Sequence, residues 1–191
     1  MIEISDIEQM FGELLDQIYD KELRAKTVNV WVEGCRQGGW ESVDQLRNMP
    51  YTLLTDTHGV NFIEHNIAVT KGAMGLAKAQ LDTYGNMPYD IDMDRLIIGG
   101  LLHDIGKLLE FEPDGKGGYQ KSLAGKCMRH PISGAVLAKE AGFDDKIANT
   151  IACHAKEGDG RPQVIETVFI HQADFATFNP LVMKNGDKLI E

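Results

Sequence analysis

The chain is poor in several features that mark particular classes of protein. It has only three cysteines, Cys35, Cys127 and Cys153, without a Cys-x-x-Cys spacing, which argues against a disulfide framework and a structural zinc motif. No apolar run approaches the roughly 20 residues that cross a bilayer, and the opening MIEISDIEQM lacks the basic and apolar regions of a secretory signal. We therefore expect a cytoplasmic protein with reduced thiols and no membrane partner.

Basic residues are scarce relative to acidic ones. The chain has 19 Lys and Arg against 29 Asp and Glu, a formal net charge of −10. Stable nucleic-acid binding is not expected, because it draws most of its affinity from clustered basic residues. A small phosphorylated partner stays compatible, since bound divalent ions can dominate the local field. No proline-rich, serine-rich or low-complexity stretch divides the chain, so we expect residues 1–191 to form a single domain.

What the sequence does contain is a succession of helix signals. Ser5-x-x-Glu8 and Ser42-x-x-Gln45 match the capping box, in which side chains satisfy free backbone N–H groups at a helix start. No alternating strand pattern competes, so an all-α fold is predicted. The expected helices in the first part of the chain are 5–17, 20–36, 42–48, 61–83 and one from Asp92 or Asp94 to His103. After a flexible loop at 114–118, a helix is expected over 132–141, with His130 as its N-cap and Gly142 as its stop. Asp144 opens the next expected helix, and Pro162 begins the last.

The most informative motif is the run GLLHDIGK at Gly100–Lys107. It places His103 and Asp104 at the end of an apolar helix, where burying an imidazole beside a carboxylate is costly without a partner such as a metal ion. A helix-end ion pair is the alternative interpretation. The Asp104 carboxylate has two oxygens and can bridge two cations, whereas each imidazole gives one nitrogen to one cation.

This run is similar, almost residue for residue, to the central motif of the HD superfamily of metal-dependent phosphohydrolases. The rest of the chain follows that family's H…HD…H…H…D order over about 58–178. The resemblance implies an HD-type helical bundle with a buried metal site, in which 1–54 form N-terminal helices, 55–178 the metal-binding core and 179–191 a C-terminal tail. The metal ligands that it implies are His65, His103, Asp104, His130, His154 and Asp174.

Two metal ions are expected because His130 and His154 match the two middle histidines that one-metal members lack. Each implied ligand has another possible role: a hydrogen-bonded core histidine for His65, an N-cap for His130, a helix-end histidine for His154 and an ion pair for Asp174. Four inward histidines with two carboxylates are nevertheless hard to satisfy in a core without metal. The donor set suits two divalent ions of Fe, Mn, Co, Ni or Zn.

The expected chemistry follows from charge. Two divalent ions with two aspartates leave a positive site that suits a phosphate and lowers the pKa of a bridging water. Asp104, as the bridge, and Lys107, as a phosphate contact, are the candidate catalytic residues; an exposed lysine at a helix end is the alternative for Lys107. Arg161 and His171 are weaker candidates for substrate contact. The alternative for Arg161 is a solvated loop arginine, and the alternatives for His171 are a packed histidine or one that supports a metal ligand. His58 competes with His65, but its surroundings match the family poorly.

These observations predict hydrolysis of a phosphoester bond in a nucleotide or a small phosphorylated molecule. Cyclic dinucleotides are less favoured, because His154-Ala155 stands where members with that activity have a double histidine. The main alternative is a diiron oxygenase acting on a polyol or phosphonate, since such enzymes have the same fold and ligand order. A non-catalytic nucleotide sensor is disfavoured by the complete ligand set. Substrate, metal identity and oligomeric state stay open.

Overall fold

Ten α-helices, one short 3₁₀ helix and one small hairpin make up the described part of the chain, residues 1–158 and 161–189, in the computed structural model. The all-α class predicted from the sequence is confirmed. The elements are α1 (Ile4–Leu15), α2 (Lys21–Gly38), α3 (Val43–Asn48), α4 (Phe62–Thr83), α5 (Met93–Leu102), α6 (Lys107–Glu110), β1 (Phe111–Pro113), β2 (Tyr119–Lys121), α7 (Leu123–Cys127), α8 (His130–Glu140), α9 (Asp145–Cys153), η1 (Lys156–Gly158) and α10 (Ile165–Asn185).

Helix starts follow the chemistry of their caps. The capping box of Ser42 and Gln45 is confirmed. The box proposed at Ser5 is wrong, because Glu3 and Asp6 form the reciprocal pair two residues earlier. His130 is not an N-cap, since it is the first residue of α8 and Arg129 stands in the capping position. The remaining side-chain caps accept backbone N–H groups of the first turn: Asp20, Asn61, Asp92, Ser122 and Asp144.

Two regions differ from the sequence expectation. The loop 114–118 lies at the tip of an antiparallel hairpin in which Phe111 pairs with Lys121. Its strands have three residues each, too few for an alternating pattern to be visible. Helix α10 begins at Ile165 rather than Pro162 and continues through Pro180 to Asn185, so helix occupies much of the segment expected as a C-terminal tail.

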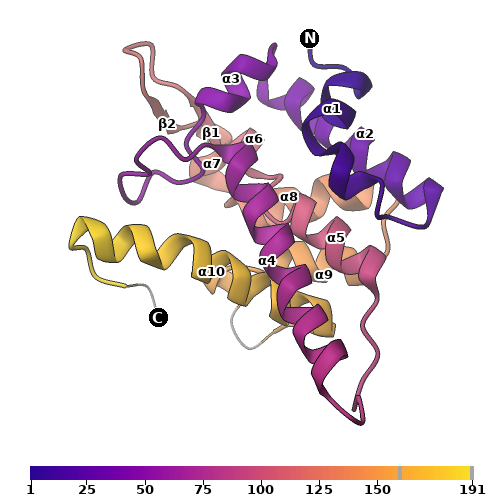
Figure 1. The fold of residues 1–191 in the computed structure, drawn as a ribbon. Coiled ribbons are helices and arrows are strands. Elements are labelled where there is room, and N and C mark those ends of the chain that lie inside the picture. Colours follow the sequence, from indigo (N-terminus) through magenta and orange to yellow (C-terminus); the bar gives the residue numbers. More distant parts are fainter. Residues whose placement is uncertain (159–160, 190–191) are drawn as a thin grey trace.

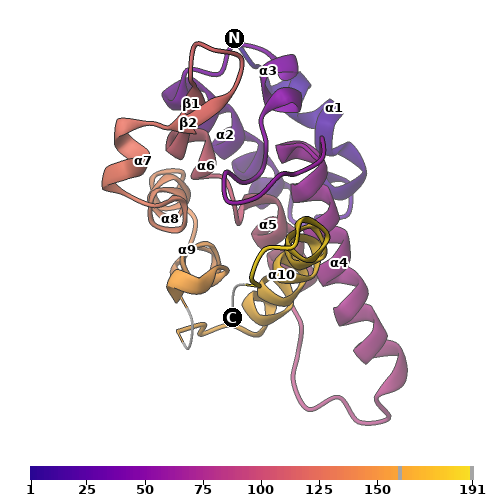
Figure 2. The ribbon, with the colours of Figure 1, turned by 90° about the vertical axis from the view of Figure 1, so that its left-hand side faces the viewer.

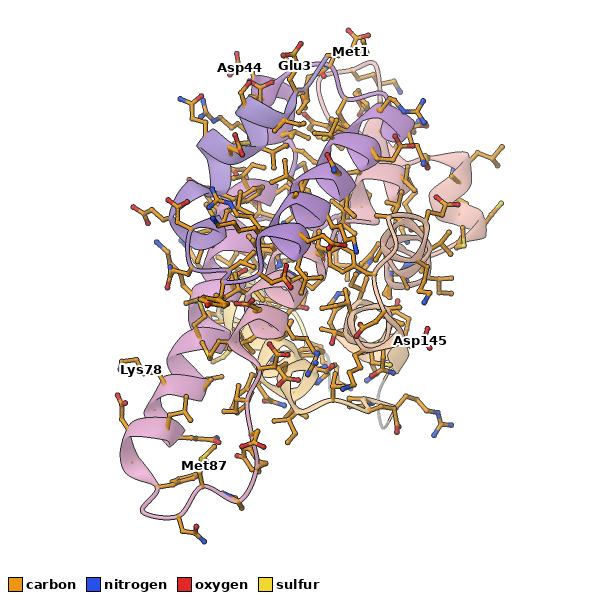
Figure 3. All side chains as sticks on the ribbon, turned by 90° about the vertical axis from the view of Figure 1, so that its right-hand side faces the viewer. Met1, Glu3, Asp44, Lys78, Met87 and Asp145 are labelled. Atoms are coloured by element: carbon orange, nitrogen blue, oxygen red, sulfur yellow. The ribbon has the colours of Figure 1, made fainter. Side chains whose placement is uncertain are left out.

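Three helices form the centre of the molecule. Figure 1 shows α4 running through the structure with α10 crossing it, and both pack against α5. Helices α8 and α9 form a second packed pair, which Figure 2 shows to the left of α10. In Figure 3, Lys78 and Met87 mark the end of α4 and the loop after it, far from Met1. No helix in the described part of the chain is long and apolar enough to cross a membrane.

Trp31 of α2 joins the N-terminal helices to the rest of the molecule. Its side chain is fully buried, with ring centroids 4.7 Å from Phe11 and 5.4 Å from Phe62. Its indole N–H also donates to the carbonyl of Leu101 at 3.1 Å, which satisfies the one polar group of a buried tryptophan. Residues of α1 and α2 therefore share a hydrophobic core with the helices that lead into the HD motif.

Two motif glycines allow the close packing that shapes the candidate site. A Cβ on Gly100 would lie 2.7 Å from the Thr70 hydroxyl oxygen, so α5 approaches α4 only without a side chain there. A Cβ on Gly106 would lie 2.1 Å from the carbonyl oxygen of His130. The missing side chain at Gly106 therefore lets the first turn of α8 reach the corner between α5 and α6.

Candidate metal centre

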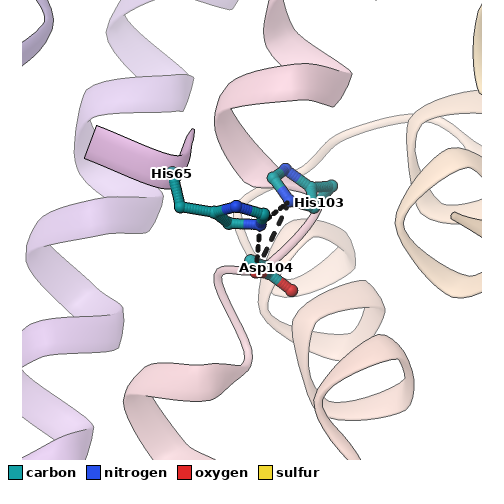
Figure 4. Close-up of side chains that lie close together, drawn as sticks. All are labelled: His65, His103 and Asp104. Atoms are coloured by element: carbon teal, nitrogen blue, oxygen red, sulfur yellow. Dashed lines mark hydrogen bonds and ion pairs between the residues drawn. The ribbon is translucent and has the colours of Figure 1, made fainter. Parts of the chain in front are cut away.

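Asp104 lies at the middle of the predicted ligands, fully buried in the turn between α5 and α6. Its Oδ2 atom is 3.3 Å from Nε2 of His65 and 3.4 Å from Nε2 of His103 (Figure 4). Its Oδ1 atom is 3.2 Å from Nε2 of His130 and 3.5 Å from Nε2 of His154. One carboxylate thus stands between two pairs of imidazoles, each pair facing a different oxygen.

Asp174 approaches the same cluster from α10. Its Oδ1 atom is 3.2 Å from Nε2 of His65, on the Oδ2 side of Asp104. Its side chain keeps 17% of its surface exposed, whereas that of Asp104 keeps 1%. The structure therefore brings all six predicted ligands together on five helical segments, and Asp174 is the carboxylate on the open side.

Two of the histidines are oriented by their own helices. The Nδ1–H group of His103 donates to the carbonyl of Gly100 at 2.6 Å, and that of His154 donates to the carbonyl of Ile151 at 2.7 Å. Both are helix C-caps that bond three residues back. This contact fixes the tautomer, because a proton on Nδ1 leaves Nε2 as a lone pair directed at Asp104.

The other two histidines are oriented by side chains from elsewhere in the fold. Nδ1–H of His130 donates to the Glu110 carboxylate at 2.9 Å. Nδ1–H of His65 faces the hydroxyl oxygen of Thr177 at 3.4 Å, while that hydroxyl donates to the carbonyl of Asp174 at 2.8 Å. All four imidazoles therefore present Nε2 to the cluster, and a partner on the opposite ring nitrogen is typical of histidines that bind metal ions.

The donor set passes a direct test of fit to divalent metal ions. Among the buried side-chain atoms of the described residues, Asp104 Oδ1 and His154 Nε2 have no hydrogen-bond partner. Leaving such a group unpaired costs about 1–3 kcal/mol or more. Ligand atoms about 2.1 Å from one ion, at angles of about 100–110°, lie about 3.2–3.4 Å apart, close to the observed separations. The groups that fit one ion each are His65, His103 and Asp104, and Asp104, His130 and His154.

The cluster also holds its carboxylates in the ionised form. Burial opposes ionisation of Asp104, but the positive charge of Lys107 lowers its pKa well below the usual range. Burial likewise opposes ionisation of Asp174, and hydrogen bonding to His65 lowers its pKa. Burial alone would lower the pKa of His65, yet its contacts with Asp104 and Asp174 raise it. A cation that bound here would meet ionised carboxylates and would compete with protons for Nε2 of His65.

Comparison with known families agrees with this geometry. The family model described as "HD domain" matches residues 62–175, more than half of the chain. The chain belongs to the HD domain family. The matched region begins with α4 and ends in α10, so it contains the whole candidate metal centre. No solved structure shows a significant match.

The curated relatives of this HD domain protein are partial matches. Ribonuclease Y of Pseudothermotoga lettingae is 33% identical over 118 residues, which are 62% of this chain and 18% of the relative. An uncharacterized protein of Methanocaldococcus jannaschii is 30% identical over 115 residues, 60% of this chain and 57% of that protein. Ribonuclease Y of Clostridium botulinum is 26% identical over 166 residues, which are 84% of this chain and 28% of that protein. The chain thus spans less than two thirds of each relative.

Glu110 is a residue of the HD site that the sequence analysis missed. It is 1% exposed and accepts from the His130 backbone N–H at 2.7 Å, from Arg129 Nε at 3.1 Å and from Lys121 Nζ at 3.0 Å. Burial opposes its ionisation, but hydrogen bonds from the side chain and backbone of His130 and from Lys121 lower its pKa to about 2. Burial also lowers the pKa of His130 to about 4, so this imidazole is neutral near pH 7. The available signal was an acidic residue inside the apolar run after the motif.

Tyr51 is a second missed residue, and it lies outside the matched HD domain. Its ring stacks on the imidazole of His65, with centroids 4.0 Å apart and planes within 11°. Its hydroxyl has no hydrogen-bond partner among the described residues. Burial, with the negative charges of Asp174 and Asp104, raises the pKa of Tyr51 to about 12, so the hydroxyl stays protonated. No sequence signal marks this tyrosine, because it stands in a loop without helical periodicity.

A cavity of about 400 Å³ opens beside the HD cluster. Its wall includes His130, Asp174 and Lys107, which connect the ligands to the space that a substrate would enter. Lys107 is the first residue of α6, is 9% exposed, and donates from Nζ to Asp104 Oδ2 at 2.5 Å. Its ammonium group therefore lies between the candidate bridge and the cavity.

The weaker candidates lie farther from this cavity. Arg161 is exposed and His171 is partly buried. Within the described part of the chain, neither side chain lines the cavity. Nδ1–H of His171 donates to the carbonyl of His154 at 2.8 Å, which supports the backbone of a predicted ligand. His58 lies outside the cluster, with Nε2 2.5 Å from Oδ1 of Asn185. Substrate contact by Arg161 or His171 stays a prediction.

Proposed function

We propose that this protein is a metal-dependent phosphohydrolase that cleaves a phosphoester bond in a nucleotide or a small phosphorylated molecule. One observation carries the proposal: the buried Asp104 carboxylate separates two pairs of imidazoles, all four presenting Nε2. Membership of the HD domain family supports it. The name of the ribonuclease Y relatives denotes cleavage of RNA, which is phosphoester chemistry.

A small molecule is the substrate class that we favour over RNA. The chain covers only 18% of the first ribonuclease Y, so that protein's substrate is not transferred to it. Its net charge of −10 also opposes stable binding of a nucleic-acid backbone. The cavity of about 400 Å³ is within the usual range for small-molecule sites.

The proposed ligand set divides at Asp104. His65, His103 and Asp174 would hold one divalent ion with Oδ2, and His130 and His154 would hold a second with Oδ1. When bound, two such ions supply Lewis acidity, which activates water and neutralises phosphoryl charge. Fe, Mn, Co, Ni and Zn all suit these nitrogen and oxygen donors.

Lys107 provides the charge that the chain itself directs at the substrate. Its ammonium group reaches both Asp104 Oδ2 and the cavity wall. A phosphoryl oxygen in the cavity would accept a hydrogen bond from Nζ, and this contact strengthens as negative charge develops. Tyr51 covers the ring of His65 and so shields the cluster from bulk water at that side.

Anaerobic turnover tests the proposed reaction. The full chain, purified without oxygen and loaded with Mn²⁺ or Zn²⁺, is incubated with a panel of nucleotides and small phosphoesters. We expect release of inorganic phosphate or of a nucleoside monophosphate, because Lewis-acid chemistry needs no change of oxidation state. Turnover that required iron, consumed O₂ stoichiometrically and left every phosphoester intact would reject the hydrolase and indicate an oxygenase.

Glu110 allows a test of the proposed ligands that does not depend on activity. Glu110→Gln removes the charge that anchors His130, and we expect affinity for one of the two ions to fall about 10–100-fold, the usual effect of losing such a partner. Calorimetric titration of the metal-free chain with Mn²⁺ measures both sites. Glu157→Gln is the matched control, because Glu157 also pairs with Arg129, at 3.1 Å. Equal binding by wild type and Glu110→Gln would show that Glu110 does not position a ligand.

A further inference from the structure

One wall of the cavity is built by segments outside the matched HD domain. Residues 51–54, which precede α4, line the cavity together with Phe178, which follows the matched region in α10. Leu53 and Leu54 are 37% and 66% exposed, although both are large apolar residues. Phe175, at the edge of the match, lines the same cavity. This apolar wall comprises Tyr51, Leu53, Leu54, Phe175 and Phe178.

The apolar wall is held in place by the end of α10. The side-chain amide of Asn185 donates to the hydroxyl of Thr55 and to the carbonyl of Asp56, each at 2.8 Å. The Thr55 hydroxyl in turn donates to Asp187 at 2.8 Å. At its base, Tyr51 contacts Phe178 edge-on, with ring centroids 6.4 Å apart. Segment 51–58 is therefore fixed against α10, and the wall is formed before any ligand binds.

The charged part of the cavity comes from other elements. Lys107 of α6, Lys121 of β2, Arg129 before α8 and Lys156 of η1 all line it. The buried carboxylate of Glu110 pairs with two of them, which holds their side chains in position. The cavity is thus amphipathic, with cations and the ligand cluster on some elements and apolar side chains on segment 51–54 and α10.

An amphipathic cavity of this size selects an amphipathic ligand. Covering exposed apolar side chains strengthens binding in proportion to the area removed from water, so a ligand that leaves Leu53 and Leu54 in water binds less tightly. A sugar or polyol phosphate would place hydroxyl groups against Leu53, Leu54 and the two phenylalanines, whose side chains offer no hydrogen-bond partner. A ligand with an aromatic or apolar group attached to a phosphate satisfies both parts of the cavity.

We propose that the apolar wall is the specificity-determining surface and that the substrate is a phosphomonoester of an aromatic or apolar alcohol, its phosphate facing Lys107. This proposal rests on the hydrolase function. In the reaction, water adds to phosphorus, the bond from phosphorus to the ester oxygen breaks, and the alcohol leaves with one proton of the water. The products are the alcohol and inorganic phosphate.

The test compares ligands that differ only in the part facing the wall. Benzyl phosphate and glycerol phosphate both release an alkyl alcohol, so their intrinsic reactivities are similar, and we expect kcat/KM to be at least about tenfold higher for benzyl phosphate. Leu54→Asn should weaken binding of benzylphosphonate about tenfold and leave methylphosphonate within about twofold, as expected for losing the apolar cover of one leucine. Leu81→Asn is the matched control, an exposed leucine on α4.

A second variant tests the wall as a unit. Asn185→Ala releases segment 51–58 and should raise KM for benzyl phosphate with little change in kcat, while metal content stays at the wild-type value. If the wild type bound the two phosphonates with equal affinity, or if Leu54→Asn weakened binding of both equally, the apolar wall would not be the specificity-determining surface. If phosphonate binding depended on Leu54 but no phosphate were released from any ester, the hydrolase function would be rejected. The apolar wall would then still be the surface that selects the ligand.

Discussion

Substituting Asp104 with alanine is expected to remove both metal ions and reduce phosphoester hydrolysis at least about 10³-fold, because metal catalysis is worth several kcal/mol and each tenfold in rate is about 1.4 kcal/mol. The reason is geometric. Asp104 is the residue shared by both groups of potential ligands, with one oxygen directed at each histidine pair. No other side chain in the described structure holds that position. Metal analysis after dialysis, with phosphate release on the same sample, measures the two effects together.

Two further variants make the Asp104 result interpretable. Asp104→Asn keeps the shape of the side chain and removes its charge, so it separates loss of ligation from loss of packing. Asp145→Ala is the control, because that carboxylate is almost fully exposed on α9. Circular dichroism reports whether each variant keeps its helices. If folded Asp104→Ala retained two ions per chain, the bridging role would have to be abandoned.

Replacing Lys107 with alanine is expected to leave both ions bound and lower kcat about 10²–10³-fold, the usual effect of removing one preorganised donor to a developing charge. Lys107 donates to the carboxylate of Asp104 and lines the cavity, but it is not itself a metal-ligand type. Lys107→Met preserves the length of the side chain and should behave like alanine. Lys71→Ala, which removes an exposed lysine on α4, should retain the wild-type rate.

The Lys107 variants also carry a prediction about pH. The positive charge of Lys107 lowers the pKa of Asp104, so its loss raises that pKa. A carboxylate must be ionised to bind a cation, and the variant should therefore release its ions at a higher pH than the wild type as pH falls. Metal retention measured across an acid titration tests this. If Lys107→Ala hydrolysed every accepted phosphoester at the wild-type rate, Lys107 would not be a catalytic residue.

Local signals in the sequence were reliable where one residue controls one contact. Asp144 caps α9 and the capping box of Ser42 begins α3, as predicted, because each side chain reaches backbone N–H groups two or three residues away. The wrong starts at Ser5 and Pro162 have a shared cause. Several residues near those helix ends are acceptable first-turn residues, and packing of the helix against its neighbours decides among them.

The sequence by itself determined the all-α class, because helical periodicity is a local pattern. The resemblance to the HD superfamily, which GLLHDIGK carries, supplied the order of the six candidate ligands. Only the tertiary structure decided which histidines face which oxygen of Asp104. That pairing depends on the close approach of α4 to α5 at Gly100 and of α8 at Gly106. The contact by which buried Glu110 orients His130 was likewise decided only by the tertiary structure. The same is true of the apolar wall formed by 51–54 and α10. Their contacts join residues as far as 132 positions apart in the chain, and no local rule of spacing reaches that far.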